Sequence, residues 1–170
     1  MAALLLIPFF ALRFGLMARL DKSALARAAA FAPVKGAEVI AYWVYQISNA
    51  AIIIALFFMG FASGPLLIAG ALLYLPGCAL LAASVAAFCA PGEDGMIRGN
   101  VYRYSRNPMY TAYFLIFMGC AAMTASPLLL TLVLCFQISA HWIIRAEERW
   151  CIQKFGKSYI AYMNEVRRYF

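Results

Sequence analysis

Long runs of apolar residues, separated by short polar stretches, make up most of the chain. Five such runs are legible, at 2–17, 39–61, 65–90, 108–124 and 127–144. A helix needs about 20 apolar residues to cross the hydrocarbon core of a bilayer. We therefore predict an all-α fold, a polytopic transmembrane bundle of about five helices whose last two form a tight hairpin.

The polar stretches predict shorter elements. Residues 19–38 suit a short helix at the membrane interface, which Pro33 and Gly36 would end. After 144 the chain remains helix-compatible to Phe155, Gly156 can end that helix, and Ser158 can cap another. We predict a cytoplasmic, interfacial C-terminal helix that lies on the membrane or folds under the bundle.

The composition agrees with an integral membrane protein. Of the 170 residues, 66% are hydrophobic and 12% are charged, and the mean hydropathy is +0.82, far from the balance of a soluble domain. The length fits a single membrane-embedded domain, 1–170, with no room for a separate soluble one. The five cysteines lack disulfide or metal-ligand spacing, so we predict no metal site.

The positive charges predict the orientation. If the helices alternate in direction, all 14 lysines and arginines lie on or near one face, whereas the opposite turns, 60–64 and 124–126, carry no charge. The positive-inside rule then makes the charged face and the C-terminus cytoplasmic and puts the N-terminus on the opposite side. The net charge of +7 reflects this topology and anionic headgroups, not nucleic acid.

Polar residues also occur inside the predicted spans. In the second span they recur at helical spacing on one face: Tyr42, Tyr45, Gln46 and Asn49. Two interpretations stay open for this face. Its amides hydrogen-bond a neighbouring helix, or they line a pocket.

The last span carries a second polar stripe. It consists of Gln137, His141, Arg145 and Glu148, which run along one face towards the cytoplasmic end. Taken singly, His141 is typical of a hydrogen-bonded core residue. Arg145 and Glu148 are spaced as an ordinary ion pair on one helix. Because ionisable groups inside a span are costly, the stripe as a whole favours a pocket.

A helix start with adjacent arginines precedes the fourth span. Asn107 suits the N-cap and Pro108 the first helical position. The free N–H groups of such a start, beside Arg103 and Arg106, would attract a carboxylate or phosphate. The alternative is that these arginines only flank the membrane.

These residues resemble a known family. The resemblance rests on two motifs: Arg106-Asn107-Pro108-Met109-Tyr110 with Tyr102 before it, and Glu147-Glu148 followed by Phe155-Gly156, Tyr159, Tyr162 and Val166. Together they resemble the isoprenylcysteine carboxyl methyltransferase and phospholipid methyltransferase superfamily of integral membrane enzymes. The chain departs from the pattern at Asn107, where many members have His, at Cys151, which replaces Leu, and by one extra residue between Gly99 and Tyr102.

The resemblance implies an S-adenosylmethionine-dependent methyltransferase that acts at the cytoplasmic face on a lipid-borne or amphiphilic acceptor. It implies a three-helix N-terminal part, 1–90, and a catalytic half, 91–170. Catalytic roles would fall to Arg106, Asn107 and Glu148. With His141 and Arg145 of the polar stripe included, the expected cofactor-binding residues are Tyr102, Arg106, Asn107, Pro108, Tyr110, His141, Arg145, Glu147 and Glu148. If the acceptor is an amine, Glu148 or His141 would take its proton.

Two other functions fit the same residues. One is an NADPH-dependent membrane reductase related to the sterol reductases, and the other is a non-catalytic membrane scaffold. Within the methyltransferase hypothesis, a phospholipid amine, a prenylcysteine carboxylate and a small thiol are all compatible acceptors. The bilayer and this amphiphile are the expected partners, and no protein partner is predicted.

Overall fold

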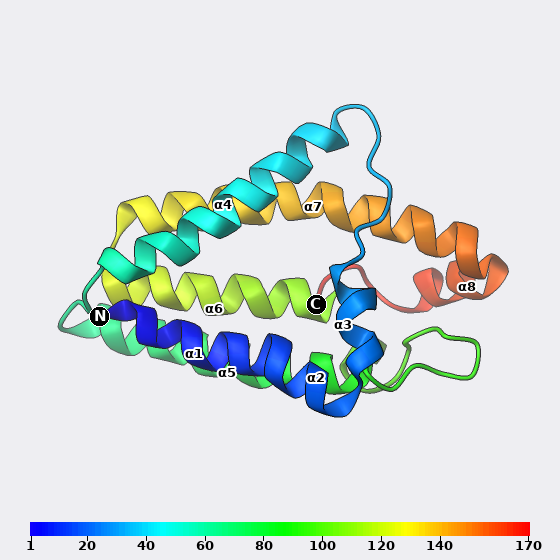
Figure 1. Ribbon diagram of the computed structural model, residues 1–170, viewed down its shortest axis with the longest axis horizontal. Helices are drawn as coiled ribbons and strands as arrows, with labels where there is room; N and C mark the ends of the chain where they lie inside the picture. The colour runs from blue at the N-terminus through cyan, green and yellow to red at the C-terminus, as the bar shows by residue number, and fades with distance from the viewer.

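A computed structural model describes residues 1–170, which form helices and connecting loops without any strand (Figure 1). The N-terminal span runs from Ala2 to Leu20 as a continuous series: η1 (Ala2–Leu5), α1 (Leu6–Phe10), the π-helix η2 (Ala11–Leu16) and α2 (Met17–Leu20). The other helices are α3 (Lys22–Ala29), α4 (Glu38–Phe58), α5 (Pro65–Phe88), η3 (Asn100–Arg103), α6 (Pro108–Thr124), α7 (Pro127–Phe155) and α8 (Lys157–Glu165). The predicted all-α bundle is confirmed.

Five of these segments match the predicted spans. Four are long and apolar enough to cross a membrane, namely Ala2–Leu20, α4, α5 and α7, and α6 is a shorter apolar helix of 17 residues. Helix α7 has 29 residues, which at 1.5 Å per residue gives about 44 Å. It therefore extends well past a hydrocarbon core of about 30 Å.

The helices alternate in direction, so the connections collect at two ends of the bundle (Figure 1). At one end the amide of Ala2 donates to the carbonyl of Met59, and the amide of Ala62 donates to that of Met123. The opposite end carries α3, the loop that follows α5, α8 and the C-terminal tail. We call it the charged end, because the polar connections of the sequence meet there.

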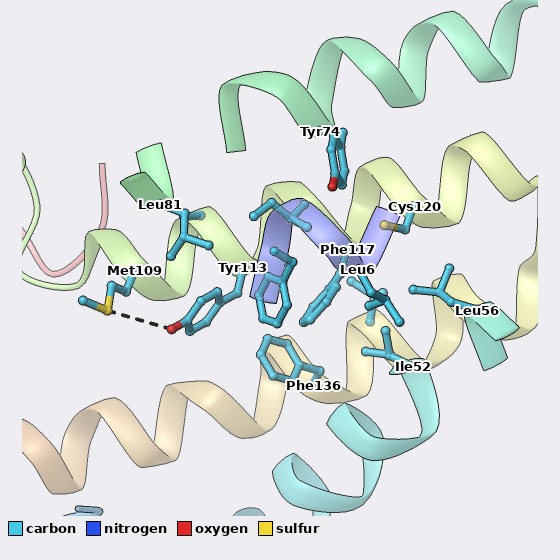
Figure 2. Close-up of a cluster of buried hydrophobic side chains, with 14 of the residues drawn as sticks. Leu6, Ile52, Leu56, Tyr74, Leu81, Met109, Tyr113, Phe117, Cys120 and Phe136 are labelled. Atoms are coloured by element: carbon cyan, nitrogen blue, oxygen red, sulfur yellow. Dashed lines mark hydrogen bonds between the residues drawn. The ribbon is translucent and has the colours of Figure 1, made fainter. Parts of the chain in front are cut away.

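Buried side chains from both parts of the sequence share one core. Figure 2 shows Leu6 of α1, Ile52 of α4, Phe117 of α6 and Phe136 of α7 turned towards one another. The rings of Phe117 and Phe136 meet edge to face with centroids 5.4 Å apart, a favourable geometry for aromatic pairs. Residues 1–90 and 91–170 are thus packed around the same apolar centre.

Glycines allow α5 and α6 to approach closely. A Cβ atom added at Gly70 would lie 2.7 Å from the carbonyl oxygen of Gly119, and one added at Gly119 would lie 2.8 Å from the carbonyl oxygen of Gly70. Larger residues would push the backbones apart. Small residues that bring helices together in this way are typical of membrane bundles.

Both short helices predicted for the charged end are present, but Ser158 does not cap the second, because α8 already begins at Lys157 with Gly156 at its N-cap and no side-chain capping hydrogen bond. Helix α3 starts at the N-cap Asp21, whose carboxylate accepts a hydrogen bond from the Ser23 amide at 2.9 Å. Helix α8 follows Gly156, which has a positive φ of 57°. Tyr159 and Tyr162 of α8 are buried together with Met96. Of the two predicted placements of the tail, on the membrane or under the bundle, the structure shows the second.

Candidate functional site

The site is built where α6 begins and α7 leaves the apolar bundle. Pro108 occupies the first turn of α6, and Asn107 precedes it at the N-cap position. The Asn107 side chain makes no capping hydrogen bond, however. Its Nδ2 donates instead to the carbonyl of Arg168, 3.1 Å away. The expected side-chain cap is therefore wrong, because the amide is used to hold the C-terminal tail.

Arg106 is the centre of a buried network. Its Nε and Nη2 donate to Oε1 of Glu148 at 3.1 and 2.9 Å, and the two side chains are only 8% and 5% exposed. Its Nη1 donates to the carbonyls of Met163 and Val166 at 2.8 and 2.9 Å. All three side-chain nitrogens of Arg106 are thus engaged inside the protein. The pair joins the two motifs across 42 positions of sequence.

Glu148 is held from two sides. Opposite Arg106, the Arg168 guanidinium donates from Nε at 3.1 Å and from Nη2 at 2.8 Å. These hydrogen bonds raise the pKa of Arg168 above its usual value, so its charge is permanent. A carboxylate between two guanidiniums has its oxygens occupied and its single negative charge more than balanced.

Further contacts bind the tail residues 163–169 to the bundle. The Arg106 amide donates to the Arg167 carbonyl at 2.9 Å, and Ser105 Oγ donates to the Arg168 carbonyl at 3.2 Å. The Tyr169 hydroxyl lies 3.0 Å from Nδ1 of His141. The C-terminus consequently ends beside the start of α6 (Figure 1).

Glu147 has a different partner from its neighbour in sequence. Its Oε1 accepts a hydrogen bond from the Tyr110 hydroxyl at 2.8 Å, and no arginine or lysine lies within 4 Å of its carboxylate. The ring of Tyr110 packs edge-on against Tyr45 of α4 and Tyr113 of α6, with centroids 6.3 and 6.2 Å away. Glu147 therefore sits against an aromatic cluster, with one hydrogen bond from a side chain.

The polar stripe of α7 splits in the structure. His141 and Glu148 reach the tail, whereas Arg145 is exposed and its guanidinium lies 5.3 Å from the Trp142 ring centroid. The ion pair between Arg145 and Glu148 that the sequence allows is not formed, because Arg106 and Arg168 occupy that carboxylate. Gln137 is distinct again: its Oε1 is buried without a hydrogen-bond partner.

Tyr102, in η3, is buried. Its carbonyl accepts a hydrogen bond from the Tyr162 hydroxyl at 2.6 Å. Burial raises the pKa of Tyr162 to about 12, so this hydroxyl stays protonated and can donate at any physiological pH. The contact ties η3 to α8 and thereby fixes the loop that leads to Arg106.

A cavity of about 320 Å³ lies beside the aromatic cluster. Its lining comes from the N-terminal span, α3, α4, α6 and α7 and includes Gln46 and Asn49. Neither amide side chain hydrogen-bonds another helix; both face this cavity. Of the two interpretations left open for the polar face of α4, pocket lining is the one observed.

Two arginines of these regions are not in the set predicted from sequence. Arg168 pairs with Glu148, and Arg13 lines the cavity. From the sequence alone, Arg13 and Arg168 are only two of the positive charges near the predicted cytoplasmic face. Neither has a spacing signal, because their partners are brought to them by the folding of the tail and of the N-terminal span.

One comparison with known proteins supports the family resemblance. Residues 85–158, less than half of the chain, match the model of a family described as phospholipid methyltransferase. This family belongs to the superfamily of integral membrane methyltransferases expected from the motifs, so the resemblance is confirmed. The matched segment contains Arg106, Glu147 and Glu148 but ends before the tail residues 163–169. No curated protein and no solved structure matches the chain.

Proposed function

We propose that this chain, whose residues 85–158 match the phospholipid methyltransferase family model, is an S-adenosylmethionine-dependent methyltransferase for a lipid-borne or amphiphilic acceptor. The family match supports a membrane methyltransferase in general. One observation carries the finer proposal: both acidic residues of the second motif reach residues of the first motif in the interior of the charged end. We place the reaction there, at the cytoplasmic face.

The residues present fit the cofactor that the family implies. Gln137 Oε1 is a buried acceptor without a donor, and the ammonium, hydroxyl and adenine amine of S-adenosylmethionine are donors. Such an orphaned group costs free energy unless a ligand satisfies it. The Tyr110 ring offers a face that attracts a cation, and Glu147 offers a negative charge. The Trp142 face is already taken by the Arg145 guanidinium. We propose that Gln137, Tyr110, Glu147 and His141 hold the cofactor.

Arg106, Glu148 and Asn107 take a supporting role in this proposal. Arg106 already donates to Glu148 and to two carbonyls, and Glu148 already accepts from two arginines. A cofactor carboxylate at Arg106 would have to displace one of these partners. We therefore assign the three residues to closing the tail over the site, which excludes water and fixes the orientation of α7.

When bound, S-adenosylmethionine supplies an electrophilic methyl group that a nucleophile displaces from sulfur. The protein's part is to hold the acceptor in line and to keep water out. Glu147 can accept a proton from an amine acceptor, since a single side-chain hydrogen bond leaves its carboxylate free capacity. Glu148 is a poorer proton acceptor, because two guanidiniums stabilise its charged form.

Calorimetric titration with S-adenosylhomocysteine tests this function, with NADPH titrated in parallel. Purified protein in detergent should bind S-adenosylhomocysteine saturably, and Gln137→Leu and Glu147→Gln should each weaken binding by about tenfold, as expected for one lost charge-assisted or buried hydrogen bond. Glu165→Gln, on the exposed side of α8, is the matched control. Binding of NADPH alone would replace the proposal by the reductase, and binding of neither would favour the scaffold.

A further inference from the structure

The cavity next to the aromatic cluster is not used by the proposed site. Helices α1 and α4 lie close at the end with the N-terminus and diverge towards α3 (Figure 1). The cavity of about 320 Å³ occupies this region, and 11 of its 14 lining residues are hydrophobic. Its volume is at the lower end of the range for small-molecule sites, about 300–1,000 Å³. It suits one hydrocarbon chain better than two.

Arg13 places a positive charge on the wall of this cavity. It lies inside the N-terminal span, within the π-helical segment η2. A π-helical turn changes the directions in which side chains leave a helix and frequently occurs at functional sites. An ionisable residue within a span is costly and normally faces a partner or a cavity.

The contacts of Arg13 leave its charge without an anion. Nη2 donates to the Ala28 carbonyl at 3.1 Å, Nη1 contacts the Met17 sulfur at 3.5 Å, and Nε makes no hydrogen bond. The Phe14 and Tyr113 rings lie 5.7 and 6.0 Å from the guanidinium carbon. These contacting groups are neutral, so none of them balances the charge, and the Glu147 carboxylate interacts with Arg13 only from beyond 4 Å.

Comparison with the other arginines shows that this is unusual within the chain. Four arginines are not exposed, and three of them, Arg106, Arg149 and Arg168, form salt bridges with a glutamate. Arg13 is the fourth, and no carboxylate lies within 4 Å of it. A sheltered guanidinium beside an apolar cavity is complementary to a ligand with an anionic group and a hydrocarbon chain.

We infer that this cavity binds a single-chain anionic amphiphile, with Arg13 holding its carboxylate or phosphate. The inference rests on the proposed function in taking this amphiphile to be the methyl acceptor. Tyr45 and Tyr113 line the cavity, and the same two rings pack against Tyr110, the partner of Glu147. The cavity wall is therefore continuous with the place proposed for methyl transfer. Arg13 would be a specificity-determining residue that selects anionic acceptors.

Binding of four probes to the full chain in phosphatidylcholine nanodiscs tests this inference. Dodecanoate and dodecyl phosphate carry the two candidate anions, methyl dodecanoate is the neutral analogue, and dodecylamine is the cationic one. Empty nanodiscs correct for partition into lipid. The variants are Arg13→Gln, Arg19→Gln as a matched control on the exposed end of the same span, and Ala29→Phe, which fills the cavity from α3.

We expect at least one anionic probe to bind the wild type about tenfold more tightly than the ester or the amine, as one charge-assisted hydrogen bond would produce. Whichever anion shows this preference identifies the group that Arg13 holds. Arg13→Gln should abolish the preference, Arg19→Gln should keep it, and Ala29→Phe should weaken all probes.

Equal binding of the anionic and neutral probes to the wild type, or an unchanged preference in Arg13→Gln, would overturn the inference. Titration of S-adenosylhomocysteine into the same nanodiscs separates it from the proposed function. If S-adenosylhomocysteine does not bind but the anionic preference is intact, the methyltransferase proposal is rejected and the anion site is retained. If S-adenosylhomocysteine binds normally but no anionic preference is seen, the anion site is rejected and the methyltransferase proposal is retained.

Discussion

Arg106 and Arg13 are both sheltered from solvent, yet their surroundings are opposite. Arg106 is saturated by Glu148 and two backbone carbonyls, whereas Arg13 has one carbonyl, one sulfur atom and an apolar cavity. A buried charge with all its hydrogen bonds satisfied by the protein stabilises a particular arrangement of chain segments. A charge without an anion is the better place to look for a ligand. Substitutions at the two positions should therefore affect different properties.

The largest effect is expected for Glu148→Ala. The change leaves Arg106 and Arg168 close together without the carboxylate between them. Loss of one partner from a buried pair costs about 3–5 kcal/mol of unfolding free energy. Thermal unfolding followed with a thiol-reactive dye should show a much lower midpoint, read from the rise in labelling as Cys120 becomes exposed above the constant labelling of the exposed Cys135. Glu165→Ala is the control, and a midpoint equal to the control's would show that the network is not stabilising.

A smaller loss is expected for Arg106→Ala, because Glu148 keeps its hydrogen bonds to Arg168. The Met163 and Val166 carbonyls lose their donor, which we expect to cost about 2–3 kcal/mol. The tail should open more often, because only Arg168 and the contacts of residues 105–107 still hold it, and trypsin should cleave after Arg167 faster than in the wild type.

Arg103→Ala is the matched control for that experiment, since Arg103 is exposed and close by in sequence. Equal cleavage rates in the two variants would contradict a tethering role for Arg106. Titration with S-adenosylhomocysteine on the same samples would show whether the loss of the tether also weakens the cofactor site.

Tyr110→Phe should have a modest effect on stability and a larger one on activity. It removes only the hydroxyl that donates to Glu147, which costs about 1 kcal/mol of unfolding free energy. If Glu147 and the aromatic cluster orient the reactants, the rate of methyl transfer should fall by more than the change in unfolding free energy accounts for. Tyr42→Phe, on the same face of α4 as Tyr45, is a suitable control, and equal rates in both variants would argue against the role of Glu147.

Arg13→Gln should change the unfolding free energy least, by less than about 1 kcal/mol, because it breaks no ion pair and a glutamine amide can still donate to the Ala28 carbonyl. The measurement is the same thermal unfolding in detergent. A loss as large as that of Glu148→Ala would mean that Arg13 is a structural residue, as Arg106 is.

The spans, the short helices and the family were predictable from the sequence, because each depends on local patterns. Apolar runs fix the helices, Gly156 ends α7, and the Arg106–Tyr110 motif lies within the family match. The partners of the polar residues were not predictable. The stripe of α7 is regular in sequence, but Arg145 faces solvent while Glu148 is buried.

The sequence by itself determined that the protein is a bundle of apolar helices with its charges gathered at one end, since hydrophobicity and helical periodicity act over a few residues. Only the tertiary structure decided that the tail returns to Arg106 and Glu148, and that a π-helical segment turns Arg13 towards a cavity. Such contacts join residues dozens of positions apart. They depend on which helix faces meet, and short-range patterns carry no information about that choice.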